Sequence, residues 1–428
     1  MSEPFAERPR RTGRAGRAVT MSQALDAIAD GSRVFVSGGS AAPCDIDRAM
    51  ADERHRWSSV ELICDRLVAP LVMFDHPNAP FRLTTLQAGP PVDRMGDSGA
   101  LTTEAVAFSR YGELLAPDGR YPIDVAIIHV SSPSPEGRFS LGVSVATPLA
   151  AMAAAPLVIA QVNPRMPYTF GAGELDRDEI DLLVDVDHRL VESARAEPSS
   201  TALLIGSTTA SLVPDEAIIQ IGVGALADAV LTALHGHRGL AIHSGMISDG
   251  VIDLYESGAL AGTTHPLFPG RVATGLASGT KRLFDFIDRN PAIITVPASI
   301  SHGQRTLRGL PRFRAVNSAV EVALDGSANG EMIGSRVISG PGGAPDYAEA
   351  AAASPDGRYI VTLPATATGG STSRIVSRLG PGIPATVEGR FVSAVVTENG
   401  IADLEGLSDQ ARAAALRAVA DPAFAGHL

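Results

Sequence analysis

The chain alternates short runs of β-branched and other apolar residues with segments rich in alanine and leucine. Runs that are apolar throughout are typical of strands that helices cover on both faces of a mostly parallel sheet. The expected strands span residues 33–37, 124–130, 157–162, 217–221, 239–243, 292–296, 359–363 and 392–397. This alternation predicts an α/β architecture with open, mostly parallel sheets.

A short internal sequence repeat indicates that the chain consists of two related halves. Each copy is expected to form a turn, a strand and a glycine bend that leads into a helix. The two copies are Asp30-Gly-Ser-Arg-Val-Phe-Val-Ser-Gly-Gly-Ser and Asp215-Glu-Ala-Ile-Ile-Gln-Ile-Gly-Val-Gly-Ala. Expected helices at 24–29 and 210–213 precede them. Gly39 corresponds to Gly224 in this alignment. One match of this length also arises by chance, because strand-to-helix turns favour glycine.

At 428 residues the chain exceeds one ordinary hydrophobic core, so we expect two tandem domains. The polar stretch 193–200 contains Pro198 and is the expected boundary between the two domains. The division is then a basic tail over 1–20, an N-terminal α/β domain over 21–197 and a C-terminal α/β domain over 198–428.

Charge and cysteine content exclude several classes of protein. The net charge of -12 and pI near 5.3 argue against a nucleic acid or an anionic membrane as the main partner. No apolar run reaches the roughly 20 residues that a membrane helix needs. Cys44 and Cys64 form neither a disulfide framework nor a zinc spacing, so no metal is expected. Residues 1–20 carry arginines but no apolar signal core, which predicts a cytoplasmic protein.

Two glycine turns are the first candidates for ligand binding. Gly222-Val-Gly224 and Gly38-Gly39 each follow an expected strand and open an expected helix. Such a bend brings backbone N–H groups close to a ligand, and the helix N-terminus favours an anion or a developing oxyanion. The alternative is an ordinary tight turn. Neither turn matches the phosphate-binding P-loop, because no Gly-Lys-Ser/Thr follows.

Further candidates lie in the second half. The segments Ser339-Gly-Pro-Gly-Gly and Thr368-Gly-Gly-Ser-Thr-Ser-Arg offer clustered N–H groups and the guanidinium of Arg374, which favours a phosphate-bearing ligand. His243 ends an apolar strand and precedes a polar loop, where open α/β sheets bind their ligands. A histidine at such a place is also commonly a structural residue with its hydrogen bonds satisfied.

Several stretches together resemble the acetyl-CoA hydrolase/transferase family, which includes 4-hydroxybutyrate and succinyl-CoA:acetate CoA-transferases. They are Asp124-Val-Ala-Ile-Ile-His-Val-Ser, Ser140-Leu-Gly-Val-Ser, Gln161-Val-Asn-Pro-Arg-Met-Pro, His243-Ser-Gly-Met-Ile-Ser-Asp-Gly-Val, Lys281-Arg-Leu-Phe-Asp-Phe, Val316-Asn-Ser-Ala-Val-Glu-Val, Gly369-Gly-Ser-Thr-Ser-Arg-Ile-Val and Thr397-Glu-Asn-Gly-Ile-Ala-Asp-Leu. The resemblance covers roughly residues 20–425 and implies two tandem open α/β domains with the active site in the cleft between them. It also implies coenzyme A, as acyl-CoA, for the ligand and a homodimer or larger oligomer.

Members of this family usually form an acyl-glutamyl anhydride and then a glutamyl-CoA thioester. The resemblance places that glutamate at Gly245, which has no side chain to act as nucleophile. The lysine that the family carries before Gly369 is Thr368 here, and 101–115 departs from the family's pattern, which implies a reshaped acyl pocket. The positions that the resemblance assigns to coenzyme A are Gly222, Val223, Gly224, Ala225, Leu226, Pro341, Gly342, Gly343, Pro345, Thr368 and Lys281, the chain's single lysine.

Three hypotheses follow. In the first, the acyl group passes directly to water or another acceptor, with His243, Asp249 or Glu398 as general base. In the second, CoA transfer to a carboxylate persists because another side chain such as Glu398 replaces the missing nucleophile. In the third, the protein binds coenzyme A without catalysing a reaction.

Overall fold

The computed structural model describes all residues except 1–15, 69–70, 77, 88–100, 195–196 and 368. Most of the expected tail and Thr368 therefore lie outside the described residues. Contacts divide the chain into two compact units: Met1–Ser193 with Gly275–Ala298, and Ala194–Thr274 with Ser299–Leu428. The sequence analysis placed a single boundary at 197/198 and did not predict that Gly275–Ala298, called the excursion below, belongs to the first unit. The chain changes unit three times: after Ser193, within β14 (Val272–Ala277) and within α9 (Ala298–Ser301).

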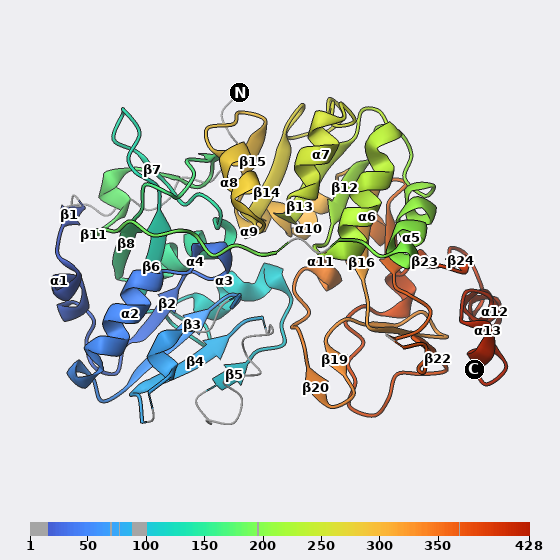
Figure 1. Cartoon of the computed structure of the whole chain (residues 1–428), viewed down its shortest axis with the longest axis horizontal. Helices are drawn as coiled ribbons and strands as arrows, with labels where there is room; N and C mark the ends of the chain where they lie inside the picture. The colour runs from blue at the N-terminus through green and yellow to red at the C-terminus, as the bar shows by residue number, and fades with distance from the viewer. Residues whose placement is uncertain (1–15, 69–70, 77, 88–100, 195–196, 368) are drawn as a thin grey trace. The chain divides into compact units, whose positions relative to one another are not determined.

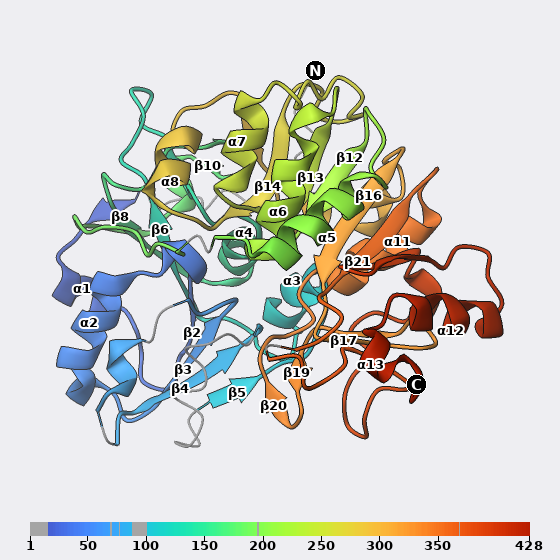
Figure 2. The same ribbon diagram turned by 45° about the vertical axis from the view of Figure 1, so that its right-hand side comes forward.

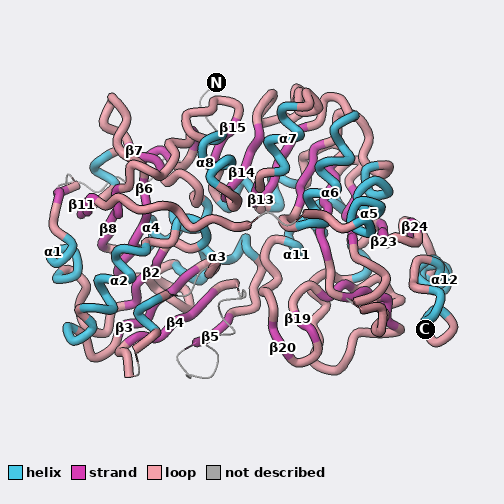
Figure 3. The backbone as a smooth tube through the Cα atoms, viewed as in Figure 1, coloured by secondary structure: helices cyan, strands magenta, loops and turns pink. Residues whose placement is uncertain are grey.

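The first unit holds an eight-stranded, wholly parallel sheet in the order β1-β11-β8-β6-β2-β3-β4-β5 (Figure 1). Its strands are β1 (Arg17–Ala18), β2 (Arg33–Val36), β3 (Val60–Cys64), β4 (Phe81–Thr85), β5 (Leu101–Thr103), β6 (Val125–Val130), β8 (Leu157–Val162) and β11 (Leu182–Asp185). Figure 3 shows these strands interleaved along the chain with helices, as expected for a parallel sheet, which needs crossover connections.

Helices cover both faces of this sheet. Leu25 of α1 (Met21–Asp26) and Met50 of α2 (Cys44–Asp52) share a buried cluster with Val34. Phe35, the next residue of β2, belongs to a second cluster with α3 (Tyr111–Leu115) and α4 (Ala146–Ala154). Neighbouring strand residues point to opposite faces, so an apolar run is buried on both sides.

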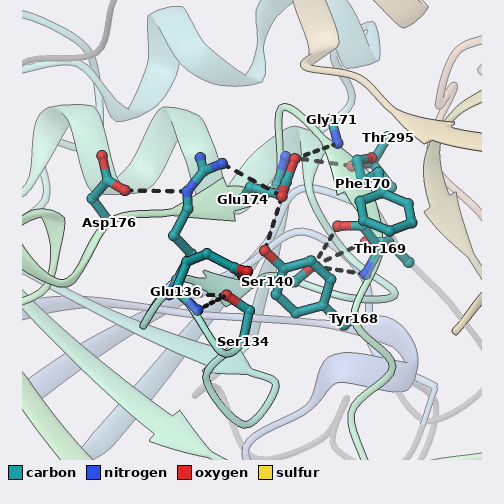
Figure 4. Close-up of polar contacts among 12 residues, drawn as sticks. Ser134, Glu136, Ser140, Tyr168, Thr169, Phe170, Gly171, Glu174, Asp176 and Thr295 are labelled. Atoms are coloured by element: carbon teal, nitrogen blue, oxygen red, sulfur yellow. Dashed lines mark hydrogen bonds and ion pairs between the residues drawn. The ribbon is translucent and has the colours of Figure 1, made fainter. Parts of the chain in front are cut away.

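The excursion Gly275–Ala298 is tied into the first unit by backbone and hydroxyl contacts (Figure 4). It carries α8 (Lys281–Ile287) and β15 (Ile293–Thr295), which pairs in parallel with β9 (Phe170–Gly171). The Thr295 hydroxyl donates to the Phe170 carbonyl at 2.9 Å, and the Ala172 N–H donates to the Thr295 carbonyl at 2.8 Å. The Ser140 hydroxyl, on β7 (Phe139–Ser140), donates to the Thr169 carbonyl at 2.9 Å and holds the same loop. β7 pairs with β10 (Glu174–Leu175).

The second unit has a sheet in the order β24-β23-β21-β16-β12-β13, parallel except for β24. Its strands are β12 (Ile218–Ile221), β13 (Ala241–Ile247), β16 (Phe313–Ser318), β21 (Arg358–Thr362), β23 (Ala394–Thr397) and β24 (Gly400–Asp403). Short strands form smaller sheets: β17 (Glu321–Ala323), β18 (Ala328–Asn329), β19 (Met332–Ile333), β20 (Arg336–Val337) and β22 (Ile375–Val376).

Helices also lie on both faces of this second sheet. α5 (Ser200–Ala210), α6 (Ala225–Ala233) and α7 (Gly250–Glu256) run along one face in Figure 1, while Figure 2 shows α11 (Ala344–Ala353) beside β21. Tyr347 of α11 and Leu416 of α12 (Asp409–Ala418) share a buried cluster with Tyr359 of β21. The remaining helices are α10 (Gln304–Leu307) and α13 (Pro422–Ala425).

The two units repeat one topology. β2 pairs with β3 on one side and β6 on the other, followed outward by β8 and β11; β12 pairs likewise with β13 and β16, followed by β21 and β23. Gly39 (φ +59°) and Gly224 (φ +107°) both have positive φ after the first strand. These matches support two related halves. The helix expected at 210–213 instead ends at Ala210, because Pro214 disfavours helix immediately before it.

The predicted fold class is confirmed, and every expected strand is present. The cleft that the sequence places between the domains stays a prediction. None of the described helices is long and apolar enough to span a membrane.

Candidate active site

The parallel strands of the second unit bring the predicted loops to one edge. β12 ends at Ile221 and is followed by the Gly222-Val-Gly224 turn, β13 contains His243 and Gly245, and Glu398 follows β23. Because β12, β13, β16, β21 and β23 run in the same direction, their carboxyl ends meet at the same edge of the sheet. Open α/β sheets bind ligands at this edge.

The glycine turn after β12 has a backbone that only glycine adopts readily. Gly224 has φ +107° and ψ 179°, and it is the residue that caps the N-terminus of α6. No atom lies within 4 Å of the position that a Cβ on Gly224 would take, so backbone conformation and not crowding requires the glycine. Val223, at the tip of the turn, is 39% exposed.

His243 is fully buried and both of its ring nitrogens have protein partners. Nδ1 lies 3.0 Å from Nε2 of His265, and Nε2 lies 3.0 Å from the Ile300 carbonyl oxygen. Nδ1 of His265 in turn accepts from the N–H groups of Leu267 and Phe268 at 3.2 and 3.1 Å. His265 therefore donates through Nε2 to His243, which donates to Ile300. Protonation of His243 at Nδ1 would break its hydrogen bond with His265.

Burial keeps these histidines neutral. Desolvation lowers the pKa of His243 to about 4 and that of His265 to about 3, in the latter case together with repulsion from His243. The geometry thus gives His243 the part of a structural residue that fixes the end of β13. Its role as a general base stays a prediction from the resemblance.

Gly245 lies against two side chains that the sequence analysis did not single out. A Cβ on Gly245 would be 2.5 Å from Nε2 of His302 and 2.7 Å from Oη of Tyr347. Real Cβ atoms do not approach other atoms this closely, so the side-chain space of residue 245 is already filled. The Gly245 N–H donates to the Tyr347 hydroxyl, which donates to the Ser301 carbonyl at 3.1 Å.

His302 stands between two glycines. A Cβ on Gly343 would also lie 2.5 Å from His302 Nε2 and 2.6 Å from Cδ2. The ring is 3% exposed, its Nδ1 lies 2.9 Å from Oγ of Ser301, and its centroid is 4.8 Å from that of Tyr347. Desolvation, followed by repulsion from His243, lowers the pKa of His302 to about 3. The residue is a neutral imidazole at neutral pH.

The second predicted coenzyme A turn is built around the same imidazole. Gly342 has φ +53°, and Gly343 caps the N-terminus of α11, whose first turn contains Pro345. Pro341 closes the turn, because its carbonyl accepts from the Ala344 N–H at 3.3 Å. This turn and the Gly245 segment are thus brought together by His302.

The two candidate carboxylates are both engaged. Asp249 is 4% exposed, directly precedes α7 without a side-chain capping hydrogen bond, and takes part in another interaction. Glu398 accepts through Oε2 from the Ala365 N–H at 2.8 Å, which fixes its carboxylate between the ends of β21 and β23. The three atoms nearest to the position of a Cβ on Gly245 belong to His302 and Tyr347, not to either carboxylate.

Among the described positions that the resemblance assigns to coenzyme A, Lys281 alone belongs to the first unit. It lines a cavity of about 470 Å³ together with Arg165, Arg189, Phe284 and Asp285. Its ammonium lies 2.6 Å from both carboxylate oxygens of Asp285 one helical turn later, and both side chains are more than half exposed. Such a pair is typical of a solvated helix surface.

Sequence reasoning missed His302 and Tyr347 because no motif marks them. His302 lies in a segment, Ser301-His-Gly-Gln, without resemblance to the stretches quoted above, and Tyr347 lies inside an alanine-rich helix. Only their packing against Gly245 and Gly343 reveals them. Among the described residues, no group of three or more His, Cys, Asp or Glu side chains is placed to hold a metal ion.

Comparison with known proteins matches both halves of the chain. Residues 7–191 match the acetyl-CoA hydrolase/transferase N-terminal domain, and residues 279–428 match the acetyl-CoA hydrolase/transferase C-terminal domain. The chain is 34% identical over 409 residues, 95% of each protein, to a 4-hydroxybutyrate coenzyme A transferase of Clostridium kluyveri. It is 30% identical over 425 residues to a succinyl-CoA:acetate/propanoyl-CoA:succinate CoA transferase of Fasciola hepatica, covering 98% of this chain and 88% of that one.

A solved structure agrees with these matches. The 4-hydroxybutyrate CoA-transferase of Porphyromonas gingivalis superposes with a TM-score of 0.80 at 31% identity, over 96% of each chain.

Proposed function

Because the chain belongs to the acetyl-CoA hydrolase/transferase family and is therefore an enzyme that acts on acyl-CoA, we propose that it passes the acyl group directly to water or another acceptor. In this proposal no glutamyl anhydride forms. The packing around Gly245 is the observation that carries it. The position that the resemblance gives to the nucleophilic glutamate has no side chain, and His302 and Tyr347 fill the space around it.

The proposed reaction with water takes place in two steps. The water oxygen bonds to the thioester carbonyl carbon while a carboxylate, Asp249 or Glu398, accepts its proton. The C–S bond then breaks, and the thiolate of coenzyme A takes that proton. The N–H groups of the Gly222–Leu226 turn are proposed to stabilise the oxyanion, because a helix N-terminus favours negative charge. Another acceptor with a hydroxyl or amino group would replace water in the same step.

The coenzyme A positions proposed in the second unit are the Gly222–Leu226 turn and the segment from Pro341 to Pro345. Both cap helices of nine or more residues, α6 and α11, and both are built on glycines with positive φ. This combination supports close approach of an anionic or polar ligand to backbone N–H groups. Thr368 and Lys281 stay in the proposal on the resemblance alone.

A second candidate function is CoA transfer to a carboxylate with Glu398 as nucleophile. Its support is the place of Glu398 at the carboxyl edge, held by the Ala365 N–H. Against it, a nucleophile must replace a lost side chain within about 1 Å to keep a useful rate, and the three atoms nearest to the side-chain position of residue 245 belong to His302 and Tyr347. Binding of coenzyme A without catalysis is the third candidate. We also propose that the protein is a cytoplasmic homodimer.

Product analysis separates these functions. The purified protein is incubated with acetyl-CoA and longer acyl-CoAs, with and without labelled acetate, and free thiol and labelled acyl-CoA are measured. Thiol release, or acyl transfer to an added amine or alcohol, in the absence of acetate is the expected result. Labelled acetyl-CoA that forms only with acetate, and disappears in Glu398→Gln, would establish the transferase instead. Coenzyme A binding by calorimetry without turnover of any thioester would establish the third function.

A further inference from the structure

We propose that the cavity of about 470 Å³ in the first unit binds an amino acid with an apolar side chain. In this assignment Arg189 receives the carboxylate of the ligand, and Glu192 and Asp288 receive its ammonium group. All residues that line the cavity belong to the first unit. The inference goes beyond the proposed function, because it rests on this cavity and requires no particular reaction in the second unit.

The place of the cavity in the fold is the first argument. Residues 164–167 follow β8 and residues 189–192 follow β11, so both segments leave the carboxyl edge of the parallel sheet. α8 and its C-cap Asp288 supply the remaining lining residues. Open α/β sheets bind ligands at this edge. The volume lies in the range of pockets that hold small molecules, about 300–1,000 Å³.

The apolar wall of the cavity is the second argument. Met166, Leu190 and Phe284 line the cavity although each is less than 10% exposed. An apolar group placed against them leaves water without losing a hydrogen bond, which tightens binding by up to about fourfold per buried methylene. A ligand that consists of charged groups alone would leave this wall in contact with water. The wall therefore favours a ligand with an apolar body.

The unpaired cation of the cavity is the third argument. Lys281 Nζ lies 2.6 Å from the carboxylate of Asp285, so this pair carries no net charge. Arg165 Nε lies 2.5 Å from the carboxylate of Asp187 and is neutralised in the same way. Arg189 is exposed, and its guanidinium has neither a hydrogen bond nor an ion pair with another described residue. A guanidinium binds a carboxylate through two parallel hydrogen bonds.

Two carboxylates in the lining decide the rest of the ligand. Glu192 Oε2 accepts from the Lys281 N–H at 3.0 Å, and Asp288 Oδ1 accepts from the Tyr168 N–H at 2.7 Å. Neither carboxylate forms an ion pair with a described cation, and the second oxygen of each has no partner among the described residues. A ligand that carries only negative charge would be repelled by both, whereas an ammonium group is attracted.

An amino acid with an apolar side chain meets all three requirements. Its carboxylate matches one free guanidinium, its ammonium group matches two free carboxylates, and its side chain covers the apolar wall. Coenzyme A matches the cavity poorly, because its several phosphate charges would face two carboxylates and one unpaired cation. A plain fatty acid lacks the group that the carboxylates attract.

Methyl NMR on the full chain tests the site. Labelled methionine methyl groups report on both units, because Met166 lines the cavity and Met246 follows Gly245 in the second unit. Met166→Leu identifies the Met166 signal. Leucine is expected to shift this signal in a saturable way. Glycine, which lacks the apolar side chain, is expected to bind at least about tenfold more weakly.

Two truncated ligands test the charged groups on the wild-type protein. 4-Methylpentanoate is leucine without its ammonium group, and 3-methylbutylamine is leucine without its carboxylate. Each is expected to bind about tenfold more weakly than leucine, the effect of one lost charge-assisted hydrogen bond. This comparison needs no variant, so it holds even if a substitution in the cavity impairs folding.

Matched variants assign each charge to its residue. Arg189→Gln should weaken leucine about tenfold and leave 3-methylbutylamine unchanged. Glu192→Gln combined with Asp288→Asn keeps acceptors for the two backbone N–H groups and should weaken leucine while 4-methylpentanoate binds no more weakly. Arg82→Gln is the control, because Arg82 is exposed on β4, near the opposite end of the sheet, and this variant should bind leucine as the wild type does.

The outcomes separate this inference from the proposed function. A protein that cleaves no thioester but binds leucine at Met166 sinks the proposed function alone. A Met166 signal that leucine does not move, a shift confined to Met246, or equal affinity for leucine and 4-methylpentanoate overturns the inference alone. A Met166 shift that coenzyme A causes, leucine does not reverse and Arg189→Gln removes would assign the cavity to coenzyme A and would also overturn it.

Discussion

Residue 245 cannot carry a side chain while His302 keeps its place, because a Cβ on Gly245 would lie 2.5 Å from Nε2 of His302. The same Cβ would lie 2.7 Å from the Tyr347 hydroxyl. Both partners are buried and held by hydrogen bonds to Ser301, so neither moves aside at low cost. Glycine at 245 and histidine at 302 therefore form one packing unit.

Gly245→Ala is expected to lower the free energy of unfolding by about 1–3 kcal/mol through overpacking. Gly236→Ala is the matched control, because no atom lies within 4 Å of its Cβ position. Chemical denaturation measures both variants. A second test introduces the family's residue: Gly245→Glu is expected to be poorly folded, and Gly245→Glu with His302→Gly to recover stability. Equal stability of Gly245→Ala and Gly236→Ala would contradict this packing.

The buried histidines predict a loss of stability in mild acid. Burial lowers the pKa values of His243 and His265 to about 4 and about 3, whereas both are near 6.5 in the unfolded chain. The unfolded state then binds more protons below about pH 6.5, so stability is complete above that pH and is lost as the pH falls. The slope is about 1.4 kcal/mol per pH unit for each histidine.

His265→Gln isolates one of these contributions. Between pH 7.5 and 5.5, we expect the variant to lose about 1.4 kcal/mol less stability than the wild-type protein. Asp47, whose pKa burial raises to about 6, titrates in the opposite sense, but it is common to both proteins and cancels. Urea titrations at several pH values give the difference. The exposed His55→Gln variant should follow the wild-type curve, and identical curves for His265→Gln would sink the prediction.

The glycine turn after β12 predicts different outcomes at its two glycines. Gly224→Ala places a side chain at φ +107° and ψ 179°, a region that is nearly confined to glycine, and should cost about 1–3 kcal/mol. Gly222→Ala meets its nearest neighbour, Asn317 Oδ1, at 3.5 Å and has no positive φ, so it should be tolerated. We expect a raised KM for acyl-CoA in Gly224→Ala alone. Similar kinetics in both variants would show that this turn does not bind the substrate.

Lys281 predicts a small effect on stability. Its exposed ion pair with Asp285 is worth about 0–1 kcal/mol, so Lys281→Ala and Asp285→Ala should each change the unfolding free energy by no more than that. If Lys281 contacts coenzyme A as the resemblance implies, Lys281→Ala raises the KM several-fold and Asp285→Ala does not. An unchanged KM in Lys281→Ala and in Lys281→Arg removes Lys281 from the proposed site.

The sequence by itself determined the architecture and the family. Strands such as 125–130 are largely apolar and buried along their whole length because helices cover both faces of the sheet, and the sequence pattern alone indicates this. The sequence also predicted the two glycine turns, and Gly39 and Gly224 both have the positive φ expected of a bend after a strand. The resemblance named the segment around Gly245 as the place of the chemistry.

Only the tertiary structure decided what surrounds that place. His243 ended the expected strand, yet its two nitrogens are occupied by His265 and Ile300, which lie far away in sequence. His302 and Tyr347 belong to other segments of the chain than Gly245, so no local sequence pattern predicts that they contact it. Secondary structure follows from the periodicity of neighbouring residues, whereas the partners of a buried polar group depend on how distant segments pack.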